Sequence, residues 1–220
     1  MSRAGAGGPR RANPKVAVVD YGMGNRRSVE KALARVGAAP TITNDHDVIR
    51  AADGLVVPGV GAFPRAMANL AELGLDELLR EQVDAGVPTL GVCLGMQLLF
   101  EESVERGGAT GLGFLPGRVE QLEAGGRKLP HIGWNLVTFK RPSALTEGLP
   151  TATPFYHVHS FAPVPAQDDD VVGRSAYAAP FVSVVDRPPL YGVQFHPEKS
   201  SEAGLRLLAN FTGVCAQVAA

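Results

Sequence analysis

A cysteine between two glycines, in the segment Gly-Val-Cys-Leu-Gly at residues 91–95, has the spacing of a nucleophile held at a sharp turn. Apolar residues at 88–92 precede it and a helical pattern follows it, so the chain passes from a strand through Cys93 into a helix. The two glycines let neighbouring backbone approach without a Cβ clash. Free N–H groups at the start of the helix, that of Leu94 first, could stabilise a thiolate and an oxyanion. The pattern predicts attack on a carbonyl group, although a small buried cysteine fits so short a motif equally well.

A cysteine nucleophile needs a base and a group that orients the base. His196 ends the apolar segment 191–195 and is followed by Pro197 and Glu198. In parallel α/β sheets the reactive groups lie beyond the carboxyl ends of the strands, where both His196 and Cys93 are expected. Glu198 is near enough to fix the imidazole tautomer and to stabilise its cationic form. Taken alone, this pair also fits a strand-end histidine with an unrelated acidic neighbour.

The other cysteine and histidines give weaker signals. Cys215 lies near the end of the chain without a comparable motif. His157 and His159 alternate on an expected strand and point the same way, which would suit half of a metal site. No third ligand accompanies them, and His131 is expected in a turn, so the sequence predicts neither a metal nor another cofactor.

Alternating strand and helix signals in the first half of the chain predict the elements that carry these side chains. The expected strands cover 16–20, 55–57 and 88–92, and the expected helices cover 28–36, 64–85 with a break at Gly74, and 94–102. Later strands are expected at 118–122, 136–139, 155–161, 171–178, 181–186 and 191–195, before a closing helix at 200–214. The predicted fold class is α/β: an open, mostly parallel sheet flanked by helices, with an antiparallel β-rich second half.

Composition and charge exclude several classes of function. The 220 residues carry a net charge of −1, which gives no basic surface for nucleic acid. No stretch approaches the roughly 18 apolar residues of a membrane span. Residues 1–14 are rich in Gly, Ala, Arg and Pro and are expected to form a disordered tail before a single domain of residues 15–220. Two cysteines exclude a disulfide framework and, with no apolar signal segment, predict a cytoplasmic protein.

Together, the segments Gly-Val-Cys-Leu-Gly-Met-Gln at 91–97 and Gln-Phe-His-Pro-Glu at 194–198 resemble the class I glutamine amidotransferases, a family of Cys-His-Glu glutaminases. The segments 20–25, 58–63, 131–135, 158–161 and 194–200 are similar to one branch of that family, which supplies ammonia to a cyclase in histidine biosynthesis. The resemblance covers residues 15–214 in order. It implies the fold of the family and the hydrolysis of glutamine to glutamate and ammonia.

The resemblance also implies a role for each motif. Cys93 would attack the side-chain carboxamide of glutamine, His196 would transfer protons, and Glu198 would orient His196. The N–H of Leu94 and one from the loop Gly59-Val60-Gly61 would hold the oxyanion. The glutamine head group would be bound by Gln97, Gly61, Ser160 and Phe161.

The partner that the resemblance implies is the cyclase subunit, a (β/α)8 barrel, in a heterodimer. Ammonia must reach it uncharged, so a water-excluding interface is expected. The residues implied at that interface are Trp134, Asn135, Tyr156 and Lys199. In this family the loop 59–61 turns an N–H inward only when the partner is loaded, and low activity is therefore expected for the isolated chain.

Three residues depart from the pattern of the family, namely Arg26, His157 and Phe161, where an aliphatic residue, an aromatic residue and tyrosine are usual. They leave the Cys-His-Glu set intact. The alternatives are a glutaminase subunit of an anthranilate- or aminodeoxychorismate-type synthase, a non-catalytic subunit that keeps the fold, and a free-standing cysteine peptidase.

Overall fold

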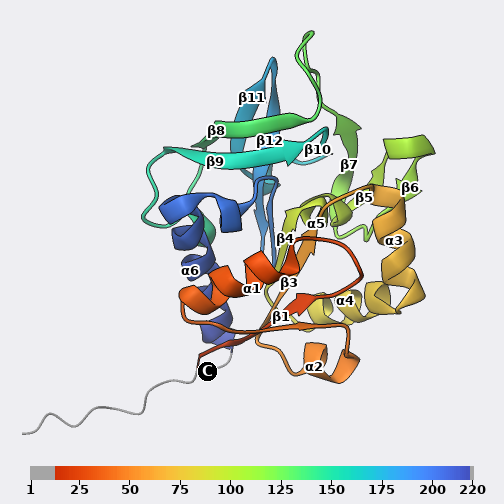
Figure 1. The fold of residues 1–220 in the computed structure, drawn as a ribbon, viewed down its shortest axis with the longest axis vertical. Helices are drawn as coiled ribbons and strands as arrows, with labels where there is room; N and C mark the ends of the chain where they lie inside the picture. The colour runs from red at the N-terminus through yellow and green to blue at the C-terminus, as the bar shows by residue number, and fades with distance from the viewer. Residues whose placement is uncertain (1–12, 219–220) are drawn as a thin grey trace, which may run out of the picture.

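A nine-stranded sheet runs through the computed structural model, which describes residues 13–218 (Figure 1). Its strand order is β2-β1-β3-β4-β13-β12-β11-β8-β9. The strands are β1 (Lys15–Val19), β2 (Ala39–Thr43), β3 (Gly54–Gly59), β4 (Thr89–Cys93), β8 (His131–Phe139), β9 (Ala152–His159), β11 (Val171–Tyr177), β12 (Ala179–Arg187) and β13 (Leu190–Val193). The four pairings from β2 to β13 are parallel, and the four from β13 to β9 are antiparallel. The predicted α/β fold with an antiparallel second half is confirmed.

Helices cover both faces of the parallel half of the sheet (Figure 1). One face carries α1 (Arg26–Arg35) and α6 (Ser201–Val218), and the other carries α3 (Phe63–Glu72) and α4 (Leu75–Asp84). Because both faces are covered, the inner strands β1 and β3 are buried at consecutive positions rather than at every second one. Side chains of β1 therefore alternate between two separate cores, with Val18 facing α1 and α6 and Val19 facing α3 and α4.

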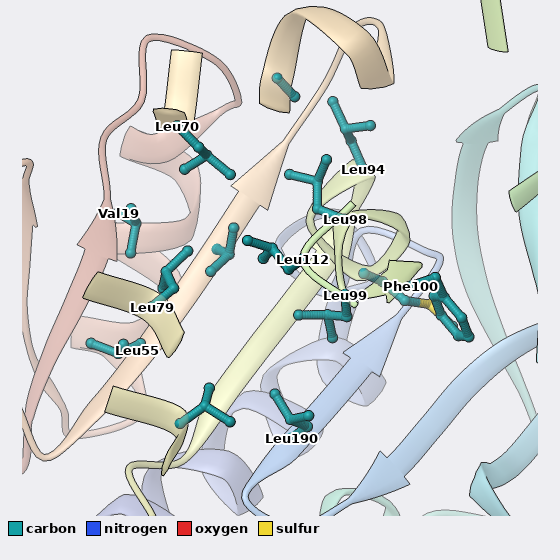
Figure 2. Packing of buried hydrophobic residues seen from close by; sticks show 14 of the residues in the cluster. Val19, Leu55, Leu70, Leu79, Leu94, Leu98, Leu99, Phe100, Leu112 and Leu190 are labelled. Atoms are coloured by element: carbon teal, nitrogen blue, oxygen red, sulfur yellow. The ribbon is translucent and has the colours of Figure 1, made fainter. Parts of the chain in front are cut away.

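The core under α3 and α4 packs leucines from both helices against the sheet (Figure 2). Leu70 of α3, Leu79 of α4 and Leu55 of β3 are all fully buried there. Each such side chain contributes roughly 1.5–3 kcal/mol through its burial. The predicted break between the two helices is confirmed, because Gly74 adopts a left-handed conformation with φ 62°.

A second sheet of four strands stands beside the first and has the order β10-β7-β5-β6. Its strands are β5 (Phe100–Ser103), β6 (Ala109–Thr110), β7 (Leu115–Gln121) and β10 (Phe161–Pro165). The predicted helix over 94–102 is wrong beyond Leu98, where α5 (Leu94–Leu98) ends. The apolar run that follows fits either periodicity, and Phe100 becomes a strand residue because it pairs with Leu115 of β7.

Two other expectations change in the second half of the chain. The strand expected at 155–161 divides at Ser160, because β9 pairs with β8 in the large sheet and β10 pairs with β7 in the small one. His131 opens β8 rather than lying in a turn. Its directly paired neighbour on β9 is His159.

The sequence did not indicate β2 or the short helix α2 (His46–Arg50), although the side chain of Asp45 caps that helix by accepting from the N–H groups of Asp47 and Val48. The remaining helical turns are η1 (Glu105–Gly107), η2 (Ala144–Thr146), η3 (Asp168–Asp170) and η4 (Pro197–Lys199). Residues 1–12 of the expected tail lie outside the described residues. Among residues 13–218, each helix is too short or too polar to cross a membrane.

Candidate active site

Cys93 occupies the turn between β4 and α5 in a backbone conformation that is rare outside glycine, with φ 55° and ψ −111°. Close packing under this turn requires the glycines on either side. A Cβ atom at Gly91 would lie 2.6 Å from the carbonyl oxygen of Gly95, and one at Gly95 would collide with the carbonyl oxygen of Val57. A strained residue held by its surroundings is typical of a nucleophile elbow.

His196 lies at the carboxyl end of the neighbouring strand, because β13 pairs in parallel with β4. Its Nδ1 is 3.0 Å from Oε1 of Glu198, and both side chains are almost completely buried. The backbone N–H of His196 donates to the carbonyl of Tyr156 at 2.9 Å, which fixes this segment against β9. The parallel register thus brings together the three residues that the sequence analysis selected as nucleophile, base and orienting group.

The electrostatic surroundings of His196 favour its cationic form. Burial alone would lower the pKa of His196, but its hydrogen-bonding interactions with Cys93 and Glu198 outweigh burial and raise that pKa to about 10. The imidazole is therefore protonated at neutral pH. A buried imidazolium beside Sγ stabilises negative charge on the sulfur and keeps a proton ready for a leaving group.

Two glutamine side chains are hydrogen-bonded to one another beside the sulfur, and one of them contacts it. Gln194 is completely buried and donates from Nε2 to Sγ of Cys93 across 3.8 Å. Its Oε1 accepts from Nε2 of Gln97 at 3.1 Å, and the same Nε2 donates to the carbonyl of Phe161 at 2.9 Å. Gln194 stands in one of the sequence motifs, but sequence reasoning gave it no role because the motif does not say which side of the strand it faces.

A pocket of about 320 Å³ opens beside the sulfur. Its lining residues are Val60, Gly61, Cys93, Leu94, Gln97, Glu105, Pro130, Val158, His159, Ser160, Phe161, His196 and Lys199. These include each residue expected to bind the glutamine head group. Glu105 was missed by sequence reasoning; it lies in η1, and its Oε2 accepts from the N–H of Phe63 at 2.8 Å. Glu105 brings a carboxylate to the wall of the pocket, and a lone glutamate on a loop gives no sequence signal.

The predicted oxyanion loop lies at the end of β3, on the other side of β4 from His196. Gly59 is paired with Cys93 in the sheet, Val60 is exposed, and Gly61 has φ +107°. The hydroxyl of Tyr21 donates to the carbonyl of Pro58 at 2.5 Å and fixes the strand just before the loop. The loop is thus anchored at its start and carries at Gly61 a conformation that favours glycine.

The four residues expected at a partner interface do not share one surface. Trp134 of β8 and Tyr156 of β9 are paired across the sheet with ring centroids 6.0 Å apart, and 54% of Trp134 is exposed. Asn135 lies on the opposite face of β8, where its side-chain amide donates to the carbonyl of Ala176 at 2.9 Å. Lys199 is exposed and lines the pocket.

The expectation that no third residue joins His157 and His159 is wrong. The two side chains do point the same way, and the side chain of His131 joins them from β8. One ring nitrogen of each of the three residues lies within 4.8 Å of the others. The sequence could not place His131 here, since its position depends on the pairing of β8 with β9.

Comparisons with known proteins agree with this geometry. The profile of the family described as Glutamine amidotransferase class-I matches residues 17–214. A relative from Moorella thermoacetica named imidazole glycerol phosphate synthase subunit HisH is 52% identical over 196 residues, covering 89% of this chain and 93% of its own. A relative of the same name from Aquifex aeolicus is 48% identical over 198 residues, covering 90% of this chain and 95% of its own.

Solved structures share the fold at lower sequence identity. A structure titled PurLQS from Thermotoga maritima superposes with a TM-score of 0.75 and 20% identity, covering 91% of this chain and 98% of that one. The structure of a putative GMP synthase component from Thermoplasma acidophilum superposes with a TM-score of 0.71 and 23% identity, covering 93% of this chain and 94% of that one.

Proposed function

The chain belongs to the class I glutamine amidotransferase family, and from this premise we propose that it is the glutaminase subunit of an imidazole glycerol phosphate synthase in histidine biosynthesis. The observation that carries the proposal is the strained Cys93 beside a buried His196–Glu198 pair at the adjacent strand end. Relatives 46–52% identical over 89–90% of the chain, all named for this synthase, support the choice of pathway.

In the first half of the reaction, the thiolate of Cys93 attacks the side-chain carbonyl carbon of glutamine. The N–H of Leu94 and one N–H of the loop Gly59-Val60-Gly61 receive the negative charge that develops on the carbonyl oxygen. The protonated imidazole of His196 then gives its proton to the departing amide nitrogen, and the C–N bond breaks. Ammonia leaves, and a γ-glutamyl thioester remains on Cys93.

In the second half, the now neutral His196 takes a proton from a water molecule as its oxygen attacks the thioester. The tetrahedral intermediate collapses, the C–S bond breaks, and glutamate leaves with the thiolate restored. Glu198 holds the imidazole through Nδ1, so that its other ring nitrogen faces the reacting atoms in both steps. The two half-reactions restore the thiolate of Cys93 and the protonated His196. One proton of the water replaces the proton that left with ammonia, and the new carboxyl group of glutamate releases the other to solvent.

The pocket offers a partner for each polar part of glutamine. Gln97, Gly61 and the backbone at Ser160 and Phe161, which all line the pocket, hold the head group, as the family resemblance implies. The carboxylate of Glu105 binds the α-ammonium group, because it is the acidic group on the pocket wall that sits apart from the His196–Glu198 pair. The ammonium group of Lys199, which is exposed and lines the pocket, can form an ion pair with the α-carboxylate of glutamine or contact the partner subunit.

The ammonia passes to the cyclase subunit HisF within a heterodimer. There it reacts with a ribulosyl aminoimidazole carboxamide phosphate substrate, which yields imidazole glycerol phosphate and aminoimidazole carboxamide ribotide. The exposed apolar face of β8, with Ile132, Trp134 and Leu136, is the surface for that partner. Such a face excludes water along the route of the ammonia and keeps it unprotonated. The two cysteines are unpaired, which suits a cytoplasmic reaction.

The deciding experiment measures glutamate released from glutamine by the full chain, alone, with HisF, and with HisF loaded with its nucleotide substrate. We expect little release by the chain alone and strong release with the loaded partner. Cys93→Ala should abolish the release, whereas Cys215→Ala, which changes the other buried cysteine, should retain it.

The alternatives give different results. If glutamate release depends on Cys93 but is unchanged by HisF, the chain is a glutaminase that does not serve histidine biosynthesis. A glutaminase subunit of an anthranilate- or aminodeoxychorismate-type synthase would give this result. A folded chain that binds HisF without releasing glutamate would be a non-catalytic subunit. Cleavage of peptides without a partner would identify a cysteine peptidase.

A further inference from the structure

Three histidines meet beside the glutamine pocket, at the joined ends of β8 and β9, and one of them, His159, lines it. His131 and His159 are directly paired across the two strands, and His157 lies on the same face of β9. All three are buried, with exposed fractions of 5%, 0% and 6% for His131, His157 and His159. The glutaminase mechanism uses none of these three rings.

Aromatic side chains hold the three rings in place. The ring of Tyr177 stacks on His131 with centroids 4.3 Å apart, and Phe181 packs edge-on against all three at 5.1–5.9 Å. Phe195 packs against His157 at 5.7 Å. Rings fixed in this way are preorganised, because they lose little freedom when they bind a common ligand.

The hydrogen bonds within the cluster leave some ring nitrogens of the three histidines without a partner. Nδ1 of His159 is 2.9 Å from the carbonyl of Phe161 and so donates its proton there. This is the second contact that metal-bound histidines commonly make, and it leaves the lone pair of Nε2 of His159 facing Nδ1 of His157 inside the cluster. Among the described residues, Nδ1 of His131 and Nε2 of His157 are buried with no hydrogen-bond partner at all. Buried polar atoms of this kind are uncommon. The unpaired nitrogen of His131 is available to a ligand, and the unpaired Nε2 of His157 has room for the proton that its Nδ1 must give up to bind one.

The distances fit one ion. Nδ1 of His157 lies 3.1 Å from Nε2 of His159. A tetrahedral Zn²⁺ ion with Zn–N bonds of about 2.0–2.1 Å holds its nitrogen ligands about 3.4 Å apart. Since one nitrogen of each residue lies within 4.8 Å of the others, the rings need to close by little more than one ångström. To bind, His157 moves its proton from Nδ1 to Nε2, which needs no other reactant.

We propose that His131, His157 and His159 form a binding site for a borderline transition-metal ion such as Zn²⁺, with three imidazole ligands and one open position. Three neutral imidazoles suit Zn²⁺ and its neighbours rather than Mg²⁺ or Ca²⁺, which prefer oxygen ligands. Neutral imidazole is the form of histidine that binds such an ion.

An ion bound by the three histidines affects the glutamine pocket through His159. This effect on activity rests on the proposed function. His159 lines the pocket, and the carbonyl of Phe161 accepts both from His159 and from Gln97. Drawing His159 toward an ion moves one donor of that shared carbonyl and so disturbs the position of Gln97, which holds the glutamine head group. Bound Zn²⁺ therefore inhibits the glutaminase.

The direct test titrates the full chain with Co²⁺ and Zn²⁺ after treatment with a chelator. We expect one ion per chain, Co²⁺ absorption bands of a four-coordinate site that Zn²⁺ displaces, and binding at least about tenfold weaker in His157→Phe. His46→Ala, which removes the half-exposed histidine of α2, should bind as the wild type does. Cys93→Ala should also retain binding, because the sulfur is not a ligand.

Equal binding by His157→Phe and the wild type would overturn the site, as would loss of binding in Cys93→Ala, which would place the ion on the nucleophile. Inhibition is measured separately, as the rate of glutamate release with and without Zn²⁺ in the presence of the loaded partner. A chain that releases glutamate and binds no ion would refute the metal site alone. A chain that binds the ion and never releases glutamate would refute the proposed function alone.

Discussion

The side-chain amide of Gln194 donates a hydrogen bond to the sulfur of Cys93 across 3.8 Å, although 101 residues separate the two positions in the chain. The contact exists because β13 lies beside β4 in the sheet. Gln194 also accepts from Gln97, so it connects the nucleophile to the residue that holds the glutamine head group. This arrangement predicts that Gln194 positions and stabilises the thiolate.

Gln194→Met keeps the length of the side chain and removes the amide donor. A hydrogen bond to a charged group is worth about 1.5–3 kcal/mol, so we expect kcat/KM for glutamine to fall by about 10–100-fold. Alkylation of Cys93 by iodoacetamide should slow as well. Gln82→Met, at another buried glutamine, is the matched control and should leave both rates unchanged. Full activity in Gln194→Met would show that the contact is only structural.

Glu198→Gln removes the negative charge next to His196 and should lower the pKa of His196 from its raised value of about 10. In the wild type, NMR of the labelled imidazole should show no titration of His196 between pH 6 and 8. In Glu198→Gln the titration should move toward that range, whereas Glu202→Gln, at an exposed site on α6, should have no effect. Titration of wild-type His196 near 6.5 would contradict the prediction.

The same raised pKa predicts how stability depends on pH. His196 binds its proton more tightly in the folded chain than in the unfolded chain, where the pKa is about 6.5. Its contribution to the free energy of unfolding is therefore complete below pH 6.5 and is lost as the pH rises toward 10. Urea unfolding at pH 6 and pH 9.5 should show the difference between the wild type and Glu198→Gln shrink with pH. A constant difference would mean that the carboxylate acts through packing.

Gly95→Ala should destabilise the fold, because the new methyl group collides with the carbonyl of Val57 beneath the elbow. We expect a loss of about 3 kcal/mol or more in the free energy of unfolding, or no folded protein. Gly213→Ala, in α6, meets no atom within 4 Å and should gain about 0.5–1 kcal/mol. Denaturant unfolding of both variants measures these changes, and equal stability of the two would refute the packing argument.

Trp134→Ala should weaken binding to HisF by about 30-fold or more, since a central aromatic anchor is typically worth at least 2 kcal/mol. The free energy of unfolding should change by less than about 0.5 kcal/mol, because 54% of Trp134 is exposed. Val48→Ala, at an exposed apolar residue on α2, is the control and should leave binding unchanged. Titration calorimetry with the cyclase measures the affinity. Unchanged binding in Trp134→Ala would place the interface elsewhere.

Local sequence was sufficient where a residue's role follows from its immediate neighbours. The strand before Cys93, the flanking glycines and the helix after it are all set within ten residues, and so is the pair His196 and Glu198. Hydrophobic period predicted β1, β3 and β4, which are buried on both faces, and the break at Gly74, but it did not indicate the half-exposed edge strand β2 or the short helix α2. It failed after Leu98, where an apolar run fits a helix or a strand and pairing with β7 decides.

What the sequence alone determined is therefore the chemistry: a cysteine at an elbow, a histidine with its acidic partner, and the family that combines them. The tertiary structure alone decided which distant side chains meet. It placed Gln194 against the sulfur, Glu105 on the pocket wall, and His131 beside His157 and His159. The first two contacts depend on how turns and strand ends are packed around the sheet. The histidine cluster depends on the register of β8 and β9, since a shift of one residue would turn these side chains to the other face of the sheet.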